Sequence, residues 1–424
     1  MSKLKLLTAA LLGCLAVSAL ANEGDRAFVG ATIIDGTGAA PLSNGVVVIS
    51  DGRIRAIGAQ DDVEIPAGAD VIDVSGRTII PGLINAHGHV GGTLGLEGGH
   101  YTRDNLQRQL SLYARYGITT VVSLGGDGAE GLALRNEQNN SDLTRSRLFV
   151  AGDVITGNSE QQIRDRVNAV ADSGVDYIKV RVDDNLGNSQ KMSQALFSAL
   201  VDQAHSRRLP VAVHLFYQDD ARFVLDQGAD LIAHSIRDED VDSDFVNQLA
   251  QSGVCYIPTL TREVSTFVYE SEPDFFGDPF FLQEVDDDIL ATLREPARQQ
   301  RVRNSASAQA YKAALQVAMR NVAALHEAGI PIAMGTDSGP PARFQGYFEH
   351  LELSMMVESG MSPAAVIQSA TGVAAQCAGL TDLGTLEPGN WGDLVILEEN
   401  PLAAIENTHS IESVWIAGNR VPTP

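Results

Sequence analysis

The chain has 424 residues, of which 44% are hydrophobic and 20% charged, and its formal net charge is −24 at pH 7. This composition is ordinary for a globular enzyme with a large core, so the fold needs no disulfide staples. The acidic excess repels nucleic acid and anionic lipid surfaces and indicates a solvated acidic surface, with steering of cationic substrates as the alternative.

The N-terminus has the pattern of a secretory signal. Two lysines precede an apolar run over residues 6–20, which ends in the small residues that a signal peptidase reads. The pattern predicts a signal peptide over residues 1–21 and therefore a secreted or periplasmic protein. The run is too short for an ordinary transmembrane helix, and no later segment is apolar enough to span a membrane. A lipoprotein signal at Cys14 is the alternative.

Short β patterns occur near both ends of the remaining chain. A hairpin with an Asp51-Gly52 turn is predicted near the start, and two strands are predicted near the end. Neither end holds enough strands for a core of its own. We therefore expect residues 22–78 and 380–424 to pack together as one small β-sandwich domain.

The middle of the chain, from residue 79 to residue 379, alternates between strand and helix patterns. Glycines such as Gly174 and Gly253 follow predicted helices, as helix C-termini require. Eight strands with intervening helices predict an α/β fold, a (β/α)8 TIM barrel. The predicted strands are residues 79–87, 118–124, 148–151, 177–182, 211–215, 231–234, 254–259 and 332–337. The clearest helices are residues 161–173, 194–207 and 308–328.

One connection is much longer than the others. Residues 261–305 follow the seventh predicted strand and carry several aromatic side chains. In a barrel such a segment lies at the C-terminal face, over any active site, which makes it a candidate lid or substrate wall. An oligomer contact and ordinary packing are the alternatives. The aromatic residues are Phe267, Tyr269, Phe275, Phe276, Phe280 and Phe281.

Ionisable side chains recur at the ends of the predicted strands. His87 and His89 end the first strand on one face, where two imidazoles can bind one metal ion. Lys179 lies inside an apolar strand, where a free lysine is rare and costly. The other members of the set are His214, His234 and Asp337. Because the strand ends meet at one mouth of a barrel, the set predicts a metal site there.

These motifs resemble those of the amidohydrolase superfamily over nearly the whole mature chain. Residues 81–89 (PGLINAHGH) are similar to its first-strand motif, and residues 335–337 (GTD) to its eighth-strand motif. Residues 386–395 (LEPGNWGDLV) resemble the family's return into the β domain, although Gly392 stands where alanine is commoner. The nearest resemblance is to prolidase-like dipeptidases and carboxypeptidases, with relatives that hydrolyse amide-linked toxins.

The resemblance implies a site for two divalent metal ions. Lys179 would carry carbon dioxide as a carbamate and bridge both ions, because a carbamate offers two oxygens whereas a free ammonium beside two dications is disfavoured. If Lys179 stays a free amine, the site is mononuclear, as in family deaminases. Zinc suits the nitrogen and oxygen ligands, with manganese, cobalt or iron as alternatives. The other ligands would be His87, His89 and Asp337 for the first ion, and His214 and His234 for the second.

The resemblance also implies a mechanism, in which a hydroxide that bridges the ions attacks the scissile carbonyl. Asp337 would be the catalytic residue that takes its proton and passes it to the leaving amine. Tyr217 is a candidate oxyanion donor, although some relatives place this tyrosine where the chain has Phe216. Arg343 is a candidate clamp for a substrate carboxylate or else a surface arginine, and Arg181 is a further candidate for substrate binding.

The sequence thus predicts a secreted, metal-dependent amidohydrolase that cleaves a C–N bond of a dipeptide or N-acyl amino acid. Ester, lactone or phosphotriester hydrolysis at the same site is an alternative, as are a mononuclear deaminase and a metal-held binding protein. A homo-oligomer is expected from the relatives. Cys255 and Cys377 follow the predicted cleavage site, and their pairing is open at this point.

Overall fold

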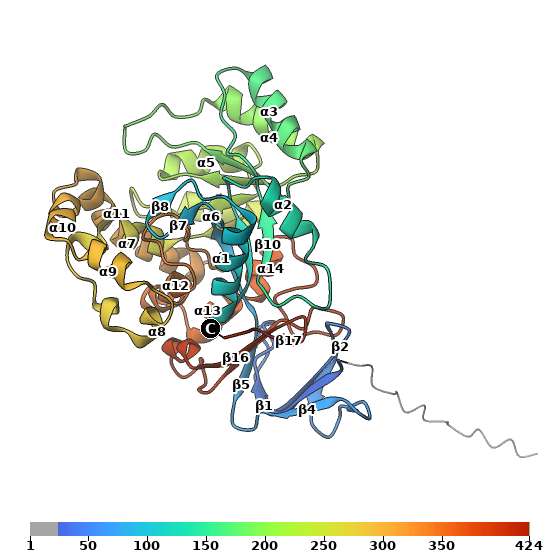
Figure 1. Ribbon diagram of the computed structural model, residues 1–424. Helices are drawn as coiled ribbons and strands as arrows, with labels where there is room; N and C mark the ends of the chain where they lie inside the picture. The colour runs from blue at the N-terminus through green and yellow to red at the C-terminus, as the bar shows by residue number, and fades with distance from the viewer. Residues whose placement is uncertain (1–23, 424) are drawn as a thin grey trace, which may run out of the picture.

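The computed structural model of the protein describes residues 24–423, so the predicted signal peptide lies outside the described residues. Figure 1 shows a layer of strands from both chain ends at the bottom of the molecule and the alternating strands and helices above it. Within residues 24–423, no helix combines the length and the apolar character that crossing a membrane requires.

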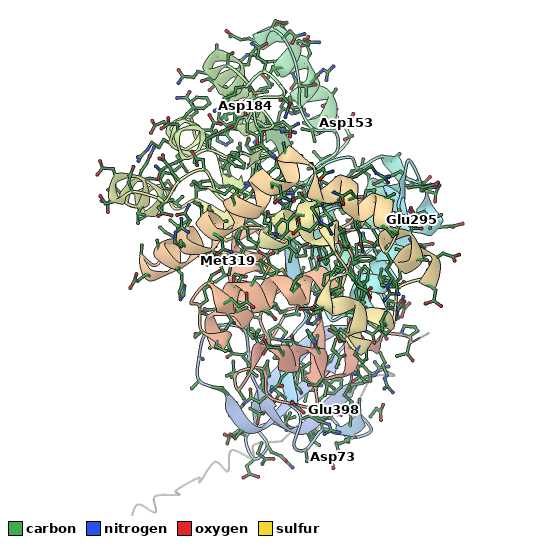
Figure 2. All side chains as sticks on the ribbon, turned by 90° about the vertical axis from the view of Figure 1, so that its left-hand side faces the viewer. Asp73, Asp153, Asp184, Glu295, Met319 and Glu398 are labelled. Atoms are coloured by element: carbon green, nitrogen blue, oxygen red, sulfur yellow. A yellow bond between two sulfur atoms is a disulfide. The ribbon has the colours of Figure 1, made fainter. Side chains whose placement is uncertain are left out.

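Strands from both chain ends form one sheet. They are β1 (Arg26–Ile33), β2 (Leu42–Ser50), β3 (Arg53–Ala59), β4 (Asp70–Asp73), β5 (Thr78–Pro81), β15 (Leu394–Leu397), β16 (Ile411–Ile416) and β17 (Asn419–Arg420). Their order is β17-β16-β15-β5-β1-β2-β3, with β4 also paired to β1. The predicted hairpin is confirmed, since Ser50 at the end of β2 pairs with Arg53. Asp73 and Glu398, from opposite ends of the chain, lie at the same end of the molecule in Figure 2.

The predicted strand over residues 79–87 is divided at Gly82. β5 pairs with β15 in the terminal sheet, whereas β6 (Leu83–Gly88) pairs with β9 (Ile118–Ser123). A Cβ atom on Gly82 would lie 2.0 Å from Thr119 Oγ1. The expectation of a single strand was wrong because glycine lets the backbone pass this close to Thr119 and leave one sheet for the other.

The other long strands form two parallel sheets, in the orders β10-β9-β6 and β11-β12-β13-β14. Their bounds are β10 (Arg147–Val150), β11 (Ile178–Arg181), β12 (Val211–His214), β13 (Leu231–Ala233) and β14 (Cys255–Ile257). The prediction of a continuous strand over residues 332–337 was wrong, because only isolated bridges join Ile332 to Tyr256 and Ser338 to Gly88. Asp337 between them has a φ of 56°, which takes the backbone out of the extended conformation.

Helices alternate with the parallel strands, and the helices predicted near residues 161–173, 194–207 and 308–328 are confirmed as α3, α4 and α11. In chain order the helices are α1 (Arg103–Arg115), α2 (Ala129–Asn136), α3 (Glu160–Asp172), α4 (Gln194–Ser206), α5 (Gln218–Asp226), α6 (Ser243–Ser252), α7 (Leu260–Phe267), α8 (Pro279–Leu282), α9 (Asp287–Leu293), α10 (Pro296–Arg303), α11 (Ala306–Glu327), α12 (Tyr347–Glu358), α13 (Pro363–Ser369) and α14 (Gly372–Cys377). Short elements complete the fold: β7 (Thr93–Leu94), β8 (Glu97–Gly98), η1 (Val268–Glu270), η2 (Asp274–Gly277) and η3 (Ile405–His409).

The long connection over residues 261–305 is largely helical and includes most of α7 together with α8, α9 and α10. Phe276 and Phe281 are buried and stack with ring centroids 5.7 Å apart. Phe275 and Phe281 also contact Tyr347 of α12, at 5.4 and 4.9 Å between ring centroids. These aromatic side chains therefore pack the segment onto α12.

Cys255 of β14 and Cys377 of α14 form a disulfide that links positions 122 residues apart. A cross-link over so long a loop restricts the unfolded chain, so replacing both cysteines with serine should lower the free energy of unfolding by about 4–5 kcal/mol. Denaturant unfolding of the two proteins measures this difference. Reduction of the unmodified protein should reproduce it, and equal stability of all three forms would contradict the prediction.

Candidate metal centre

The histidine side chains predicted at the strand ends lie together. The ring centroid of His87 is 5.7 Å from that of His89 and 4.6 Å from that of His234. The ring of His214 is 4.1 Å from that of His234. β12 and β13 are parallel neighbours in one sheet, and β6 belongs to the other parallel sheet. The ring contacts show that the carboxyl ends of these strands meet, which brings together residues far apart in sequence.

His87, His89 and Asp337 form a compact group whose potential ligand atoms all lie within 4.8 Å of one another. Oδ1 of Asp337 is 2.8 Å from Nε2 of His89 and 3.6 Å from Nε2 of His87. Burial raises the pKa of Asp337, but Arg343 and His89 outweigh burial and hold that pKa well below its ordinary value. The carboxylate is therefore charged at neutral pH.

The hydrogen bonds of this group fit a bound cation. Nδ1 of His89 donates to the carbonyl of Gly125 at 2.9 Å, which leaves Nε2 directed at the Asp337 carboxylate. Either a proton or a metal ion can lie between these two atoms. Nδ1 of His87 is buried and has no hydrogen-bond partner within residues 24–423.

Lys179 of β11 contacts this group, with Nζ 3.1 Å from Nε2 of His87. The residue is only 4% exposed. Burial lowers the pKa of Lys179 to about 7, so a substantial fraction of the amine is neutral at neutral pH. A neutral amine is the form that reacts with carbon dioxide.

His214 and His234 complete the cluster, since the ring of His234 contacts those of both His87 and His214. Burial lowers the pKa of His214 to about 3 and holds the pKa of His234 well below its ordinary value. Both imidazoles are therefore neutral, which is the state that binds metals. A hydrogen bond of 2.7 Å between Nδ1 of His234 and Oγ1 of Thr259 fixes that ring.

The structure adds Asp183, which the sequence analysis missed. Its Oδ2 lies 3.2 Å from Nε2 of His214, and its Oδ1 accepts a hydrogen bond of 2.6 Å from Nε of Arg181. Burial raises the pKa of Asp183, but the contacts with His214 and Arg181 outweigh it and keep the side chain charged. Its position just past β11 was the available signal, because His89 and His234 likewise lie just past the ends of β6 and β13.

The three candidate substrate-binding residues are all engaged by carboxylates. Tyr217 donates a hydrogen bond of 2.9 Å to Asp184, and Arg343 donates to Asp337. Arg181 pairs with Asp183 and also lines an open hollow of about 960 Å³ between the loops that precede α3 and α4. Each of the three side chains therefore already has a carboxylate partner, and none of them offers an unpaired anion-binding group to the metal-binding residues.

Two buried glutamates of α12 support the segments that carry the ligands. Glu349 accepts hydrogen bonds of 2.6 Å from each of Asn85, Thr336 and Ser338, which flank His87 and Asp337. Glu352 accepts hydrogen bonds of 2.7 Å from the backbone amides of Leu260 and Thr261. α12 thus ties β6, residues 331–338 and the start of α7 to one another.

Glu352 gives a prediction for the pH dependence of stability. Burial raises its pKa to about 7 in the folded protein, above the value of about 4.3 expected in the unfolded chain. Its contribution to stability is therefore present below the unfolded pKa and is lost as the pH rises through the folded pKa. From about pH 4.5 to about pH 8, we expect the free energy of unfolding of the wild type to fall by about 3 kcal/mol relative to that of Glu352→Gln. Urea unfolding over this range measures the difference, and parallel profiles would contradict it.

Comparison with known proteins agrees with the motifs. The Amidohydrolase family profile matches residues 78–421. The imidazolonepropionase of Streptomyces griseus subsp. griseus is 23% identical over 415 residues, which cover 91% of this chain and 95% of that protein.

Solved structures show the same fold. One is a putative prolidase from Bifidobacterium longum, with a TM-score of 0.76, 25% identity and coverage of 94% of this chain and 95% of that one. Another is a Xaa-Pro dipeptidase with bound methionine, with a TM-score of 0.76, 21% identity and coverage of 94% and 100%. The family match spans most of the sequence and confirms the resemblance predicted from the motifs. The chain therefore belongs to the amidohydrolase family and is a hydrolase of that family.

Proposed function

We propose that the protein is an exported, metal-dependent hydrolase that cleaves the C–N bond of a dipeptide or N-acyl amino acid. The observation that carries the proposal is the meeting of four imidazoles, a buried lysine and a charged aspartate at one place. Similar structures include proteins described as a putative prolidase and a Xaa-Pro dipeptidase, which supports a dipeptide-like substrate.

The fold belongs to the same proposal. The two parallel sheets and residues 331–338 would close as a (β/α)8 barrel, since bridges already join that segment to Tyr256 and to Gly88. The sheet built from both chain ends would form the core of the β-sandwich domain over residues 22–78 and 380–424. In such a barrel the candidate metal centre would lie at the mouth, where such enzymes carry their active sites.

The residues fit two divalent metal ions. His87, His89 and Asp337 would hold one ion, and His214 and His234 the other. Lys179 would bridge them as a carbamate: the neutral amine adds to carbon dioxide, the new N–C bond forms, and one proton leaves. When bound, the ions supply Lewis acidity to the scissile carbonyl and lower the pKa of water.

The chain's own residues would move the proton. Asp337 is placed to accept a proton at one carboxylate oxygen while Arg343 holds the other. It would then deliver this proton to the nitrogen of the breaking bond, because an amine is a far better leaving group than an amide anion. The contacts of Arg343 keep the carboxylate aligned for both transfers.

Export is proposed from the signal-peptide pattern and is supported by the disulfide between Cys255 and Cys377. Disulfides form and persist in oxidising compartments such as the periplasm.

A substrate panel tests the proposed function. The metal-loaded mature protein is assayed on dipeptides, N-acyl amino acids and the matching esters, by following release of the amine or alcohol. We expect amine release that stops when a chelator removes the metal. Ester or lactone turnover without any amide turnover would replace the C–N assignment, and binding without turnover of any compound would exclude an enzyme.

A further inference from the structure

Two buried arginines share a single carboxylate beside the histidines of the proposed second ion. Nε of Arg237 lies 3.0 Å from Oε1 of Glu263, and Nη1 of Arg262 lies 3.0 Å from Oε2. The side chains of Arg237 and Glu263 are 0% exposed and that of Arg262 is 9% exposed. The two guanidinium groups outnumber the one carboxylate that they contact, and a further anion in contact with them would balance this cluster.

The pair stands next to the candidate metal centre. Arg237 follows His234 by three residues, and Arg262 lies in the first turn of α7, directly after β14. Nη1 of Arg237 donates to the carbonyl of Leu215, the residue after His214, at 3.1 Å. The backbone amide of Arg262 donates to the carbonyl of Thr259 at 3.0 Å, and the hydroxyl of Thr259 contacts Nδ1 of His234 at 2.7 Å. Both arginines are therefore joined to the segments that carry His214 and His234.

Both guanidinium groups retain donors for an anion. Nη2 of Arg262 donates to the Tyr311 hydroxyl at 3.2 Å, and the guanidinium carbon lies 4.1 Å from the centre of that ring. Nε of Arg262 and Nη2 of Arg237 are buried and have no hydrogen-bond partner within residues 24–423. Because a carboxylate accepts hydrogen bonds at both oxygens and carries the opposite charge, these unpartnered donors suit a carboxylate.

Aromatic side chains surround this cluster. Tyr311 and Phe216 have ring centroids 6.0 Å apart, and Phe216 packs on Tyr217 at 4.9 Å. The guanidinium carbon of Arg237 lies 4.7 Å from the centre of the Phe216 ring. Phe216 follows His214 by two residues, so the apolar wall runs from the metal centre to the arginines. An apolar surrounding strengthens an ion pair formed there.

We propose that Arg262, supported by Arg237 and Tyr311, binds the free α-carboxylate of the substrate's C-terminal amino acid. The inference rests on the proposed C–N hydrolysis and narrows it to substrates that end in a free carboxylate. It replaces Arg343 and Arg181 as the carboxylate clamp, because those two arginines are already paired with Asp337 and Asp183. The aromatic wall favours an apolar side chain on the same amino acid.

The test compares N-acetyl-leucine with N-acetylleucinamide, which lacks the carboxylate charge, by acetate release. We expect the wild type to prefer the free acid, and Arg262→Met to lower kcat/KM for the acid about 100-fold, mainly through KM, while the amide changes little. Arg262→Lys keeps the positive charge but not the guanidinium group, so its kcat/KM for the acid should lie between those of the wild type and Arg262→Met. Arg320→Met is the matched control, since Arg320 is an exposed arginine that pairs with Asp240.

A binding measurement separates failure of this inference from failure of the proposed function. Calorimetry on the metal-loaded protein compares leucine with leucinamide in the wild type and in Arg262→Met. If neither acetyl compound is cleaved, the proposed C–N hydrolysis fails. The carboxylate site is still supported in that case if Arg262→Met binds leucine more weakly than the wild type does, while the two proteins bind leucinamide equally. Equal turnover of acid and amide by the wild type, or equal leucine affinity in both proteins, would overturn the inference.

Discussion

Replacing Lys179 with methionine is expected to reduce the bound metal from about two ions to at most about one per chain and to abolish most activity. Loss of a residue that merely orients a metal ligand commonly costs about 10- to 100-fold, so removal of the bridging ligand should lower kcat/KM by more than about 100-fold. Methionine fills a similar buried volume without an amine, in a position that is only 4% exposed.

Spectroscopy distinguishes a carbamate from a free amine at this position. Wild-type protein equilibrated with ¹³C-bicarbonate should show a carbamate carbon signal that is absent from Lys179→Met. Burial keeps part of the Lys179 amine neutral near pH 7, and the neutral amine is the form that reacts with carbon dioxide. A variant with the wild-type metal content and turnover would refute the bridging role of Lys179.

Asp337→Asn is expected to lower kcat by about 100- to 10,000-fold while KM changes little, because the asparagine amide cannot accept and return the proton. Asp337 is also a candidate ligand, so metal content must be measured in the same preparation. A variant that keeps its metal but turns over slowly supports the proton role. Full turnover by a folded, metal-loaded variant would contradict it.

A matched control for this substitution is Asp240→Asn. Asp240 is an exposed aspartate that pairs with Arg320, outside the group of side chains assigned to the reaction. Its replacement should leave kcat within about two-fold of wild type, as is usual for surface changes. A similar loss in both variants would point to a general effect on folding.

The sequence located the candidate ligands because their positions follow from local rules. His87, His214 and His234 each end an apolar strand, and parallel strands bring their ends together whatever the intervening helices do. The terminal sheet was likewise foreseeable, since each chain end carries strands that cannot form a core alone.

The divided strands were not foreseeable from hydrophobic pattern alone. The run from residue 79 to residue 87 is continuously apolar enough for one strand, yet its first part pairs with β15, far away in the chain. Asp337 has a left-handed backbone conformation that no apolar pattern encodes. In both places tertiary contacts decide where the regular structure stops.

The residues that could not be predicted from the sequence were missed for one physical reason: their contacts come from elements far apart in the chain. Glu349 and Glu352 lie on α12, and their partners are donors from β6, α7 and residues 331–338. Arg262 and Arg237 can be recognised as a pair only from their shared contact with the carboxylate of Glu263. The balance of charges in the interior depends on which elements pack together, so it can be determined only from the three-dimensional structure.

The most direct test of the central claim is the metal content of the mature protein, saturated with zinc in the presence of bicarbonate and then freed of excess metal. The residues around Lys179 predict about two ions per chain, with the second lost on removal of carbon dioxide. A single ion or none under these conditions, with the protein folded, would contradict a two-ion centre bridged by Lys179.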